Sequence, residues 1–184
     1  KLINKPKKPL IVILGGSKVE SKLSLIDRFL NVADRIIIGG GMVFTFMKAQ
    51  GKNIGNSIYQ EDLVSSAFDI LEKTKNSQKL VFPSDYLCNT SIDSKKKPVI
   101  FSKNEIKDGY MGLDIGPRSI KRFQSILNDA ETIFWNGPMG VFENKNYEQG
   151  TKTLASSLAE LSEKGAESII GGGDSASALK RYNL

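Results

Sequence analysis

The stretch Leu10–Lys18 reads LIVILGGSK, an apolar, β-branched run that ends in two glycines. Such a short apolar run predicts a buried strand, and the glycine turn lets the backbone approach a ligand closely. The same pattern recurs at 39–42 (GGGM), 135–140 (WNGPMG) and 171–174 (GGGD). Parallel sheets bind ligands beyond the carboxyl ends of their strands, so we expect the four turns to meet at one sheet edge.

Strand and helix patterns alternate along the rest of the chain. The predicted strands are 10–14, 35–38, 79–82, 111–115, 132–135 and 168–170. The predicted helices are 18–33, 42–50, 60–75, one that starts at Gly116-Pro117, 149–163, and one capped by Asp174. The segment 86–108 breaks the alternation and is interpreted as an excursion with one edge strand at 98–101. Six strands with helical crossovers predict a single doubly wound α/β domain over residues 1–184, with a mainly parallel, Rossmann-like six-stranded sheet and helices on both faces.

The composition is that of an ordinary globular protein, with 184 residues of which 40% are hydrophobic and 25% are charged. The net charge of +6 is scattered, without the basic stripe and interleaved aromatic residues that nucleic-acid binding favours. The basic run Lys95–Lys97 lies beside a proline and is interpreted as a solvated turn. No apolar run approaches the length of about 18 residues that a membrane span needs. We therefore expect neither a nucleic-acid partner nor a membrane span.

The chain has one cysteine, Cys88, and no histidine. These counts exclude an internal disulfide, a Cys–His nucleophile pair and a histidine metal site, and they favour a reducing, cytoplasmic location. The chain begins at Lys1 without an apolar signal core, so we expect a boundary within a longer protein.

Two common phosphate-binding fingerprints are absent. The P-loop pattern has no match, and G-x-G-x-x-G fails because Gly39 and Gly41 are followed by Phe44 at the third glycine position. The turns therefore predict a nucleotide site of another design.

Lys18 and Lys22 follow the first turn at a spacing that places both on one face of a helix start. Two like charges there repel each other and oppose the positive end of the helix dipole, and a bound polyphosphate would relieve both costs. The alternative is a pair of solvated surface lysines.

The last turn, 171–174, opens a helix whose free N–H groups form an anion site. Asp174 is itself an anion, which makes sense beside a phosphate if Mg²⁺ lies near both. The alternative is that Asp174 is only the N-cap of that helix.

The loop 135–143 offers three kinds of contact. Asn136 can donate its amide to a phosphate, Glu143 can accept hydrogen bonds from a ribose diol, and the apolar residues between them form a flat surface for a base. The alternative is a Pro/Gly turn with one exposed glutamate.

In combination these strings resemble the C-terminal, nucleotide-binding domain of phosphoglycerate kinase. The matching stretches occur in the family's order and span nearly the whole chain; they are 14–22, 39–46 (GGGMVFTF), 81–85, 109–117 (GYMGLDIGP), 134–143 (FWNGPMGVFE) and 171–175. The resemblance implies reversible phosphoryl transfer between ATP and the acyl phosphate of 1,3-bisphosphoglycerate in glycolysis, with Mg²⁺ as cofactor and a monomeric enzyme.

The resemblance also implies roles for individual residues. Lys18, Lys22 and Asn136 would contact phosphate, and Glu143 would take the ribose hydroxyls. The adenosine pocket would be lined by Gly16, Gly41, Gly112, Leu113, Pro138 and Val141. The terminal phosphates would be bound by Gly172, Gly173, Asp174 and Ser175, with Asp174 at the metal. The residues implied in catalysis are Lys22, Gly172 and Gly173.

The chain departs from the family pattern in a few places. The family has Ala at Ser17, Thr at Ser175 and Ser-Asp at Glu20-Ser21. Nothing here resembles the N-terminal domain that holds 3-phosphoglycerate, or the glycine-rich segment that follows the last helix, so we expect about half an enzyme. Two rival interpretations are a nucleotide-binding module without kinase activity and a nicotinamide dehydrogenase domain, against which the broken fingerprint argues.

Overall fold

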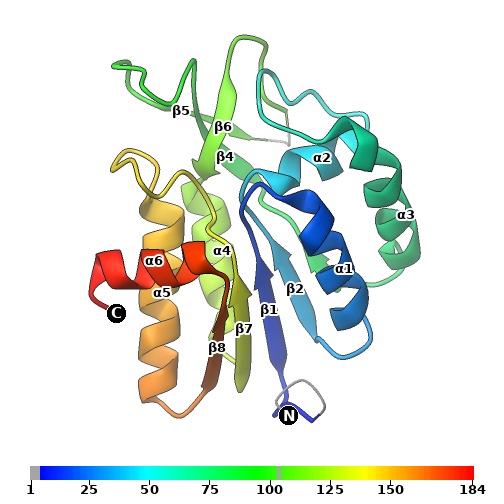
Figure 1. Cartoon of the computed structure of the whole chain (residues 1–184), viewed down its shortest axis with the longest axis vertical. Helices are drawn as coiled ribbons and strands as arrows, with labels where there is room; N and C mark the ends of the chain where they lie inside the picture. Colours follow the sequence, from blue (N-terminus) through cyan, green and yellow to red (C-terminus); the bar gives the residue numbers. More distant parts are fainter. Residues whose placement is uncertain (1–4, 103–104) are drawn as a thin grey trace.

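The computed structural model describes residues 5–102 and 105–184. The expectation about the start of the chain concerned residues 1–4 and lies outside the described residues, as do positions 103 and 104 of the predicted excursion. The elements in chain order are β1 (Leu10–Leu14), α1 (Val19–Phe29), β2 (Arg35–Ile38), α2 (Met42–Ala49), η1 (Glu61–Leu63), α3 (Val64–Thr74), β3 (Leu80–Val81), β4 (Asp85–Asn89), β5 (Val99–Ser102), β6 (Met111–Ile115), α4 (Pro117–Leu127), β7 (Thr132–Asn136), α5 (Gln149–Glu163), β8 (Glu167–Gly171) and α6 (Gly173–Tyr182) (Figure 1).

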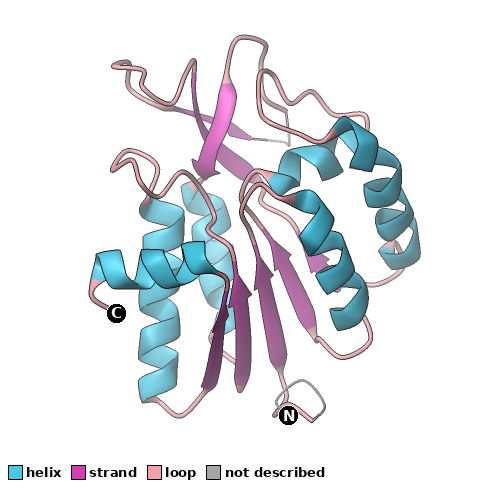
Figure 2. Ribbon diagram, in the orientation of Figure 1, coloured by secondary structure: helices cyan, strands magenta, loops and turns pink. Residues whose placement is uncertain are grey.

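The main sheet has five parallel strands in the order β3-β2-β1-β7-β8. The helices α1, α2 and α3 cover one face, and α4 and α5 cover the other (Figure 2). The predicted class, a mainly parallel doubly wound α/β domain, is confirmed. Strand β1 explains the layering, because Leu10, Val12 and Leu14 enter one core while Ile11 and Ile13 enter the other. A strand buried on both faces must be apolar throughout, as this one is.

The sheet has one strand fewer than the sequence predicted. The segment Met111–Ile115 is a strand, but it belongs to a separate antiparallel sheet with the order β5-β4-β6. Its partner β4, with the sequence DYLCN, mixes polar and apolar residues and gives no strand pattern, so it was missed. This small sheet covers the edge at which the parallel strands have their carboxyl ends (Figure 1).

Most predicted helices are confirmed with shorter ends. Helix α1 starts after Lys18, whose backbone is extended, and stops at Phe29 rather than at residue 33. Helix α2 ends before Gly51, which has a positive φ, as a helix-terminating glycine requires. Helix α6 begins two residues earlier than predicted. Its N-cap is Gly172 at φ 86°, so the prediction that Asp174 caps this helix is wrong.

The four glycine turns converge at one edge, as predicted. The N–H of Gly16 donates to the carbonyl of Pro138 at 2.8 Å, and the N–H of Gly40 donates to the carbonyl of Met139 at 3.1 Å. The N–H of Gly137 donates to Oγ of Ser175 at 2.7 Å, which joins the last turn to the others. The backbones of the first three turns therefore touch directly, and the side chain of Ser175 connects the last turn to them.

Gly40 shows why the turns need glycine. A Cβ atom there would lie 2.3 Å from the nitrogen of Gly16, and Gly40 has φ +64°. Gly51 has a similar φ of +70°, but nothing lies within 4 Å of its hypothetical Cβ. Backbone strain is common to both positions, whereas steric overlap occurs only at Gly40.

We expect Gly40→Ala to lower the free energy of unfolding by at least about 2 kcal/mol, because strain and overlap add. The matched control Gly51→Ala should cost only about 1 kcal/mol, the price of a left-handed alanine. Urea denaturation of both variants measures the difference. Equal losses at the two positions would show that the turns do not need close contact.

Candidate functional site

A cavity of about 260 Å³ lies where the glycine turns meet the small sheet. It is lined by residues of eight segments of the chain: Gly16, Ser17, Gly40, Gly41, Phe44, Ile58, Tyr86, Ile92, Met111, Gly112, Leu113, Asp114, Ile115, Pro138, Met139, Gly140, Val141, Phe142, Glu143 and Asp174. The walls are mostly apolar side chains and glycine backbone. A concave, apolar site at the carboxyl ends of parallel strands is where an α/β domain binds its ligand.

All six residues predicted for the base end line this cavity, namely Gly16, Gly41, Gly112, Leu113, Pro138 and Val141. They come from four elements that are far apart in the sequence. The predicted ribose residue Glu143 and the predicted metal residue Asp174 also line it. The structure thus brings together residues that the sequence could only name separately.

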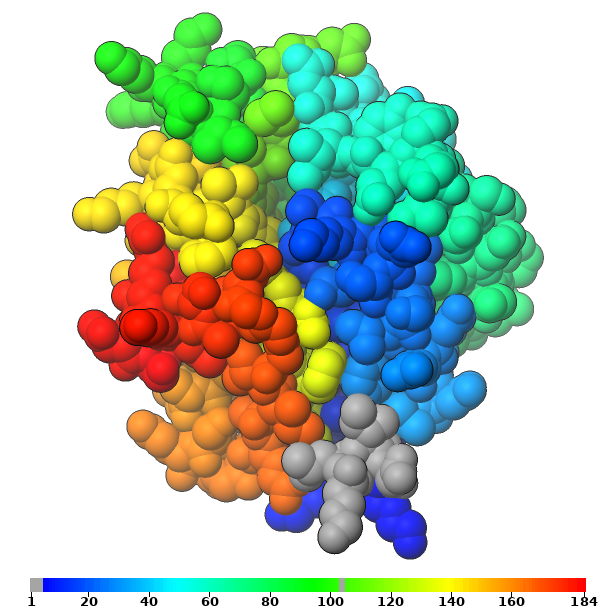
Figure 3. All heavy atoms as spheres, in the orientation of Figure 1, coloured from blue at the N-terminus to red at the C-terminus, as the bar shows by residue number. Residues whose placement is uncertain are grey.

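Three residues predicted to contact phosphate, Lys18, Lys22 and Asn136, lie outside the cavity lining. Nζ of Lys22 donates to Oδ1 of Asn136, which connects α1 to the end of β7. Burial lowers the pKa of Lys22, Asp174 nearby raises it, and Lys18 lowers it. Figure 3 shows the blue, yellow and red segments that carry these residues side by side on one face. The ammonium groups and the carboxylate therefore share one electrostatic environment.

The start of α6 has no side-chain cap. Gly172 and Gly173 are exposed, so the first N–H groups of the helix face outward, as an anion site requires. Asp174 is exposed in the first turn. Ser175 differs from these neighbours, because it is fully buried and its Oγ accepts the N–H of Gly137. Its hydroxyl thus supports the turn 136–140.

Glu143 lies in a loop that is hydrogen-bonded to helix α6. The guanidinium of Arg181 donates to the carbonyl of Glu143 at 3.2 Å and lies 3.5 Å from the carboxylate of Glu148. Helix α6 thereby contacts the loop of Glu143 near its C-terminus, while its N-terminus carries Asp174.

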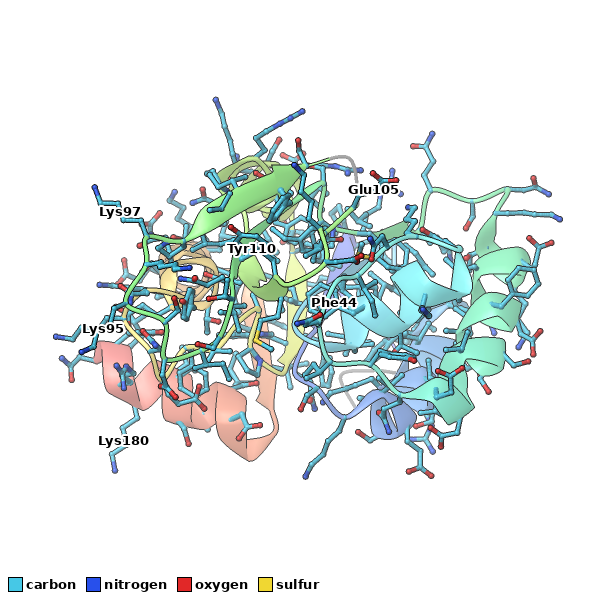
Figure 4. The ribbon with its side chains drawn as sticks, turned by 90° about the horizontal axis from the view of Figure 1, so that it is seen from above. Phe44, Lys95, Lys97, Glu105, Tyr110 and Lys180 are labelled. Atoms are coloured by element: carbon cyan, nitrogen blue, oxygen red, sulfur yellow. The ribbon has the colours of Figure 1, made fainter. Side chains whose placement is uncertain are left out.

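Several residues that line the cavity have no recognisable signal in the sequence. Phe44 lies at the centre of the view in Figure 4, and its ring centroid is 5.7 Å from that of Tyr86. Phe44 was considered only as the residue that breaks the G-x-G-x-x-G pattern, and Tyr86 lay in a strand that was not predicted. Ile58 and Ile92, which are 56% and 42% exposed, lie in loops whose sequences have no pattern. Lys95 and Lys97, in contrast, project from the periphery, as expected of a solvated turn (Figure 4).

Asp114 is the missed residue with the most unusual chemistry. It lines the cavity with only 4% exposure, and burial raises the pKa of its carboxyl to about 7. Hydrogen bonds from the N–H groups of Gly150 and Ile115 act in the opposite direction. The signal in the sequence was an aspartate inside an otherwise apolar strand.

The donor set for a metal is small. Within the described ranges, no group of three His, Cys, Asp or Glu side chains could hold a metal ion by itself. Asp174 lines the cavity and is the acidic residue in the first turn of α6. Such a site fits Mg²⁺, which often takes one protein carboxylate together with substrate phosphates and water.

None of the helices in the described parts of the chain is long and apolar enough to cross a bilayer.

The sequence model of the phosphoglycerate kinase family matches residues 1–184, the whole chain. The chain belongs to the phosphoglycerate kinase family. It is 47% identical to a chloroplastic phosphoglycerate kinase of Volvox carteri, over 99% of this chain and 40% of the relative. It is 45% identical to the phosphoglycerate kinase of Fervidobacterium nodosum, over 100% of this chain and 46% of the relative.

Solved phosphoglycerate kinases have the same fold. The structure from Coxiella burnetii covers all of this chain with a TM-score of 0.91 at 34% identity, and 47% of that protein is matched. The structure from Pyrococcus horikoshii has a TM-score of 0.81 at 28% identity, over 98% of this chain and 46% of that protein. The chain thus spans less than half the length of these relatives.

We expect Asp114 to make the fold less stable as pH rises. Its pKa is about 7 in the folded chain and 3.8 ordinarily, so the folded state holds the proton more tightly. This stabilisation is complete below pH of about 4 and is lost as pH rises through about 7. The difference in unfolding free energy between the unmodified chain and Asp114→Asn should therefore fall by up to about 1.4 kcal/mol per pH unit in that interval. Urea denaturation at several pH values tests this, and a constant difference would contradict it.

Proposed function

We propose that the chain is the ATP/ADP-binding half of a phosphoglycerate kinase, which transfers a phosphoryl group reversibly between 1,3-bisphosphoglycerate and ADP in glycolysis. The observation that carries the proposal is the convergence of four glycine turns at one mainly apolar cavity, with Lys22 hydrogen-bonded to Asn136 outside its lining. An apolar slot suits a base, and ammonium groups beside a helix N-terminus suit phosphates.

In this proposal the chain's own residues mainly bind and orient the nucleotide. Pro138 and Val141 bracket the base, and Glu143 accepts the ribose hydroxyls. Lys18 and Asn136 hold phosphate oxygens. The N–H groups at Gly172 and Gly173 bind the terminal phosphates, as does the turn at Ser175. Phosphoryl transfer depends chiefly on such positioning and on charge neutralisation.

Mg²⁺ would be held by Asp174, and it would neutralise phosphate charge when bound. Lys22 would meet the transferring phosphoryl group. Its lowered pKa and its contact with Asn136 are consistent with an ammonium held in a partly buried place before substrate arrives.

The remaining substrate would be held elsewhere in the protein. We propose that 3-phosphoglycerate binds an N-terminal domain outside these 184 residues and that the enzyme is a monomer. We also propose a reducing, cytoplasmic location, supported by the single buried cysteine Cys88. Some relatives are named as chloroplastic proteins.

We expect this chain by itself to bind ADP or ATP with Mg²⁺ and to show negligible turnover. Transfer needs both substrates held in line, and losing one site forfeits a proximity contribution that reaches roughly 7–11 kcal/mol. Calorimetry with ADP, beside a coupled kinase assay, measures both properties, and NAD serves as the control ligand. Robust turnover, absence of ADP binding at millimolar nucleotide, or preference for NAD would each overturn the proposal.

We expect Asp174→Ala to weaken ADP binding strongly in Mg²⁺ and little in a chelator, because a metal-linked carboxylate loses its benefit when the metal is removed. Calorimetric titration of both proteins under both conditions gives the comparison. The control is Glu148→Ala, which removes a carboxylate near α6 that is not expected to touch the metal. Equal weakening in Mg²⁺ and in chelator would remove Asp174 from the metal site.

We expect Lys22→Ala to lower kcat of the full-length enzyme on the order of 100-fold, since it removes a contact made mainly in the transition state. Lys18→Ala, at the N-cap of the same helix, should act more on the KM for nucleotide. Lys22→Arg should rescue only in part, because a planar guanidinium does not replace a compact ammonium. Steady-state kinetics separate the two lysines, and a Lys22→Ala enzyme with altered KM but normal kcat would reject the assignment.

A further inference from the structure

Asp114 is a buried carboxylate in the wall of the cavity, and neither the base-binding nor the phosphate-binding roles proposed above use it. It lies on β6, next to the predicted pocket residues Gly112 and Leu113, and is 4% exposed. A buried carboxylate is costly unless hydrogen bonds compensate it, so its position calls for a physical reason.

Two backbone N–H groups satisfy this carboxylate. Oδ2 accepts from Gly150 at 2.7 Å, and Oδ1 accepts from Ile115 at 2.8 Å. Gly150 lies in the first turn of α5, so the carboxylate receives one of the N–H groups that the start of this helix leaves free. The loop that precedes α5 is thereby anchored to β6.

The same loop is packed directly onto the carboxylate. A Cβ atom on Gly140 or on Gly150 would lie 2.4 Å from Oδ1 of Asp114, so both glycines are needed for the approach. One residue further along, the N–H of Val141 donates to the carbonyl of Leu113 at 2.8 Å. The segment 138–143 supplies Pro138 and Val141 to the cavity wall, and its distance from β6 depends on these contacts.

We propose that Asp114 is a positioning residue that holds the segment 138–143 at the right distance from β6 for a nucleotide base, and so sets affinity for the base rather than for the phosphates. The inference rests on the proposed nucleotide site and deepens it. A carboxylate suits this place because both of its oxygens accept hydrogen bonds, whereas an asparagine offers one acceptor and an NH₂ group.

Asp85 provides a matched comparison. It is also buried, at 0% exposure, and it accepts the N–H groups of Arg118 at 3.0 Å and Ser119 at 2.8 Å in the first turn of α4. The two aspartates thus perform the same anchoring at neighbouring helices. Only Asp114 of the pair lines the cavity, so a base-specific effect should separate them.

The test measures Kd values by calorimetry for ADP and for inorganic tripolyphosphate, which has charge but no base. Asp114→Asn should raise the Kd for ADP by about tenfold or more and leave the Kd for tripolyphosphate within about twofold. The reason is that one buried N–H loses its acceptor in the part of the site proposed to bind the base, and not where the phosphates are proposed to bind. Asp85→Asn should leave the ratio of the two Kd values unchanged. Equal effects of Asp114→Asn on both ligands, or none on ADP, would overturn the positioning role.

A second measurement needs no variant, in case Asp114→Asn does not fold. In the unmodified chain, ADP should slow hydrogen exchange at the amides of Gly150 and Val141 more than tripolyphosphate does, and the amides of Arg118 and Ser119 should not distinguish the two ligands. Identical exchange with both ligands at Gly150 would reject the inference. Failure of the unmodified chain to bind ADP at all would instead overturn the proposed function on which it rests.

Discussion

The site depends on direct backbone contact between the turns that follow β1, β2 and β7. The carbonyl of Pro138 accepts the N–H of Gly16, and a Cβ atom on Gly15 would lie 2.2 Å from that same oxygen. Because no side chain fits between these turns, glycine is required where they meet. Their contact places peptide groups, rather than side chains, along one floor of the cavity.

The opposite side of the cavity is formed by the second, antiparallel sheet. The antiparallel strands β5, β4 and β6 lie over the carboxyl ends of the parallel strands, and β6 brings Leu113 and Asp114 into the cavity. The contacts between β6 and the segment 138–143 connect the antiparallel sheet to the turns of the parallel sheet. The cavity is thus an interface between two sheets, and its width depends on hydrogen bonds that a single sheet would not supply.

Burial shifts the pKa values of charged groups at the edge of the parallel sheet where the turns meet. The apolar end of the cavity holds one carboxylate, Asp114, whose pKa is raised to about 7 because water is excluded. At the other end, the pKa of Lys22 is lowered by partial burial and by Lys18, while Asp174 opposes the change. A polyanion would relieve the lysine repulsion, which supports the proposal that phosphates bind at this end of the site.

The sequence by itself determined the α/β class, most helices, the convergence of the four turns and several residues that line the cavity. These follow from local rules: apolar runs for doubly buried strands, glycine where backbones touch, and the parallel-sheet rule that places strand ends together. Motif strings such as GLDIGP and WNGPMGVFE added the family. The tertiary structure decided what depends on distant partners. It placed Met111–Ile115 in a second sheet, which the sequence could not show because the partner strand β4 has no local strand signal. It also made Gly172 rather than Asp174 the cap of α6. It also brought Phe44, Tyr86 and Asp114 to the cavity, since burial and pKa are properties of surroundings that only the folded chain provides.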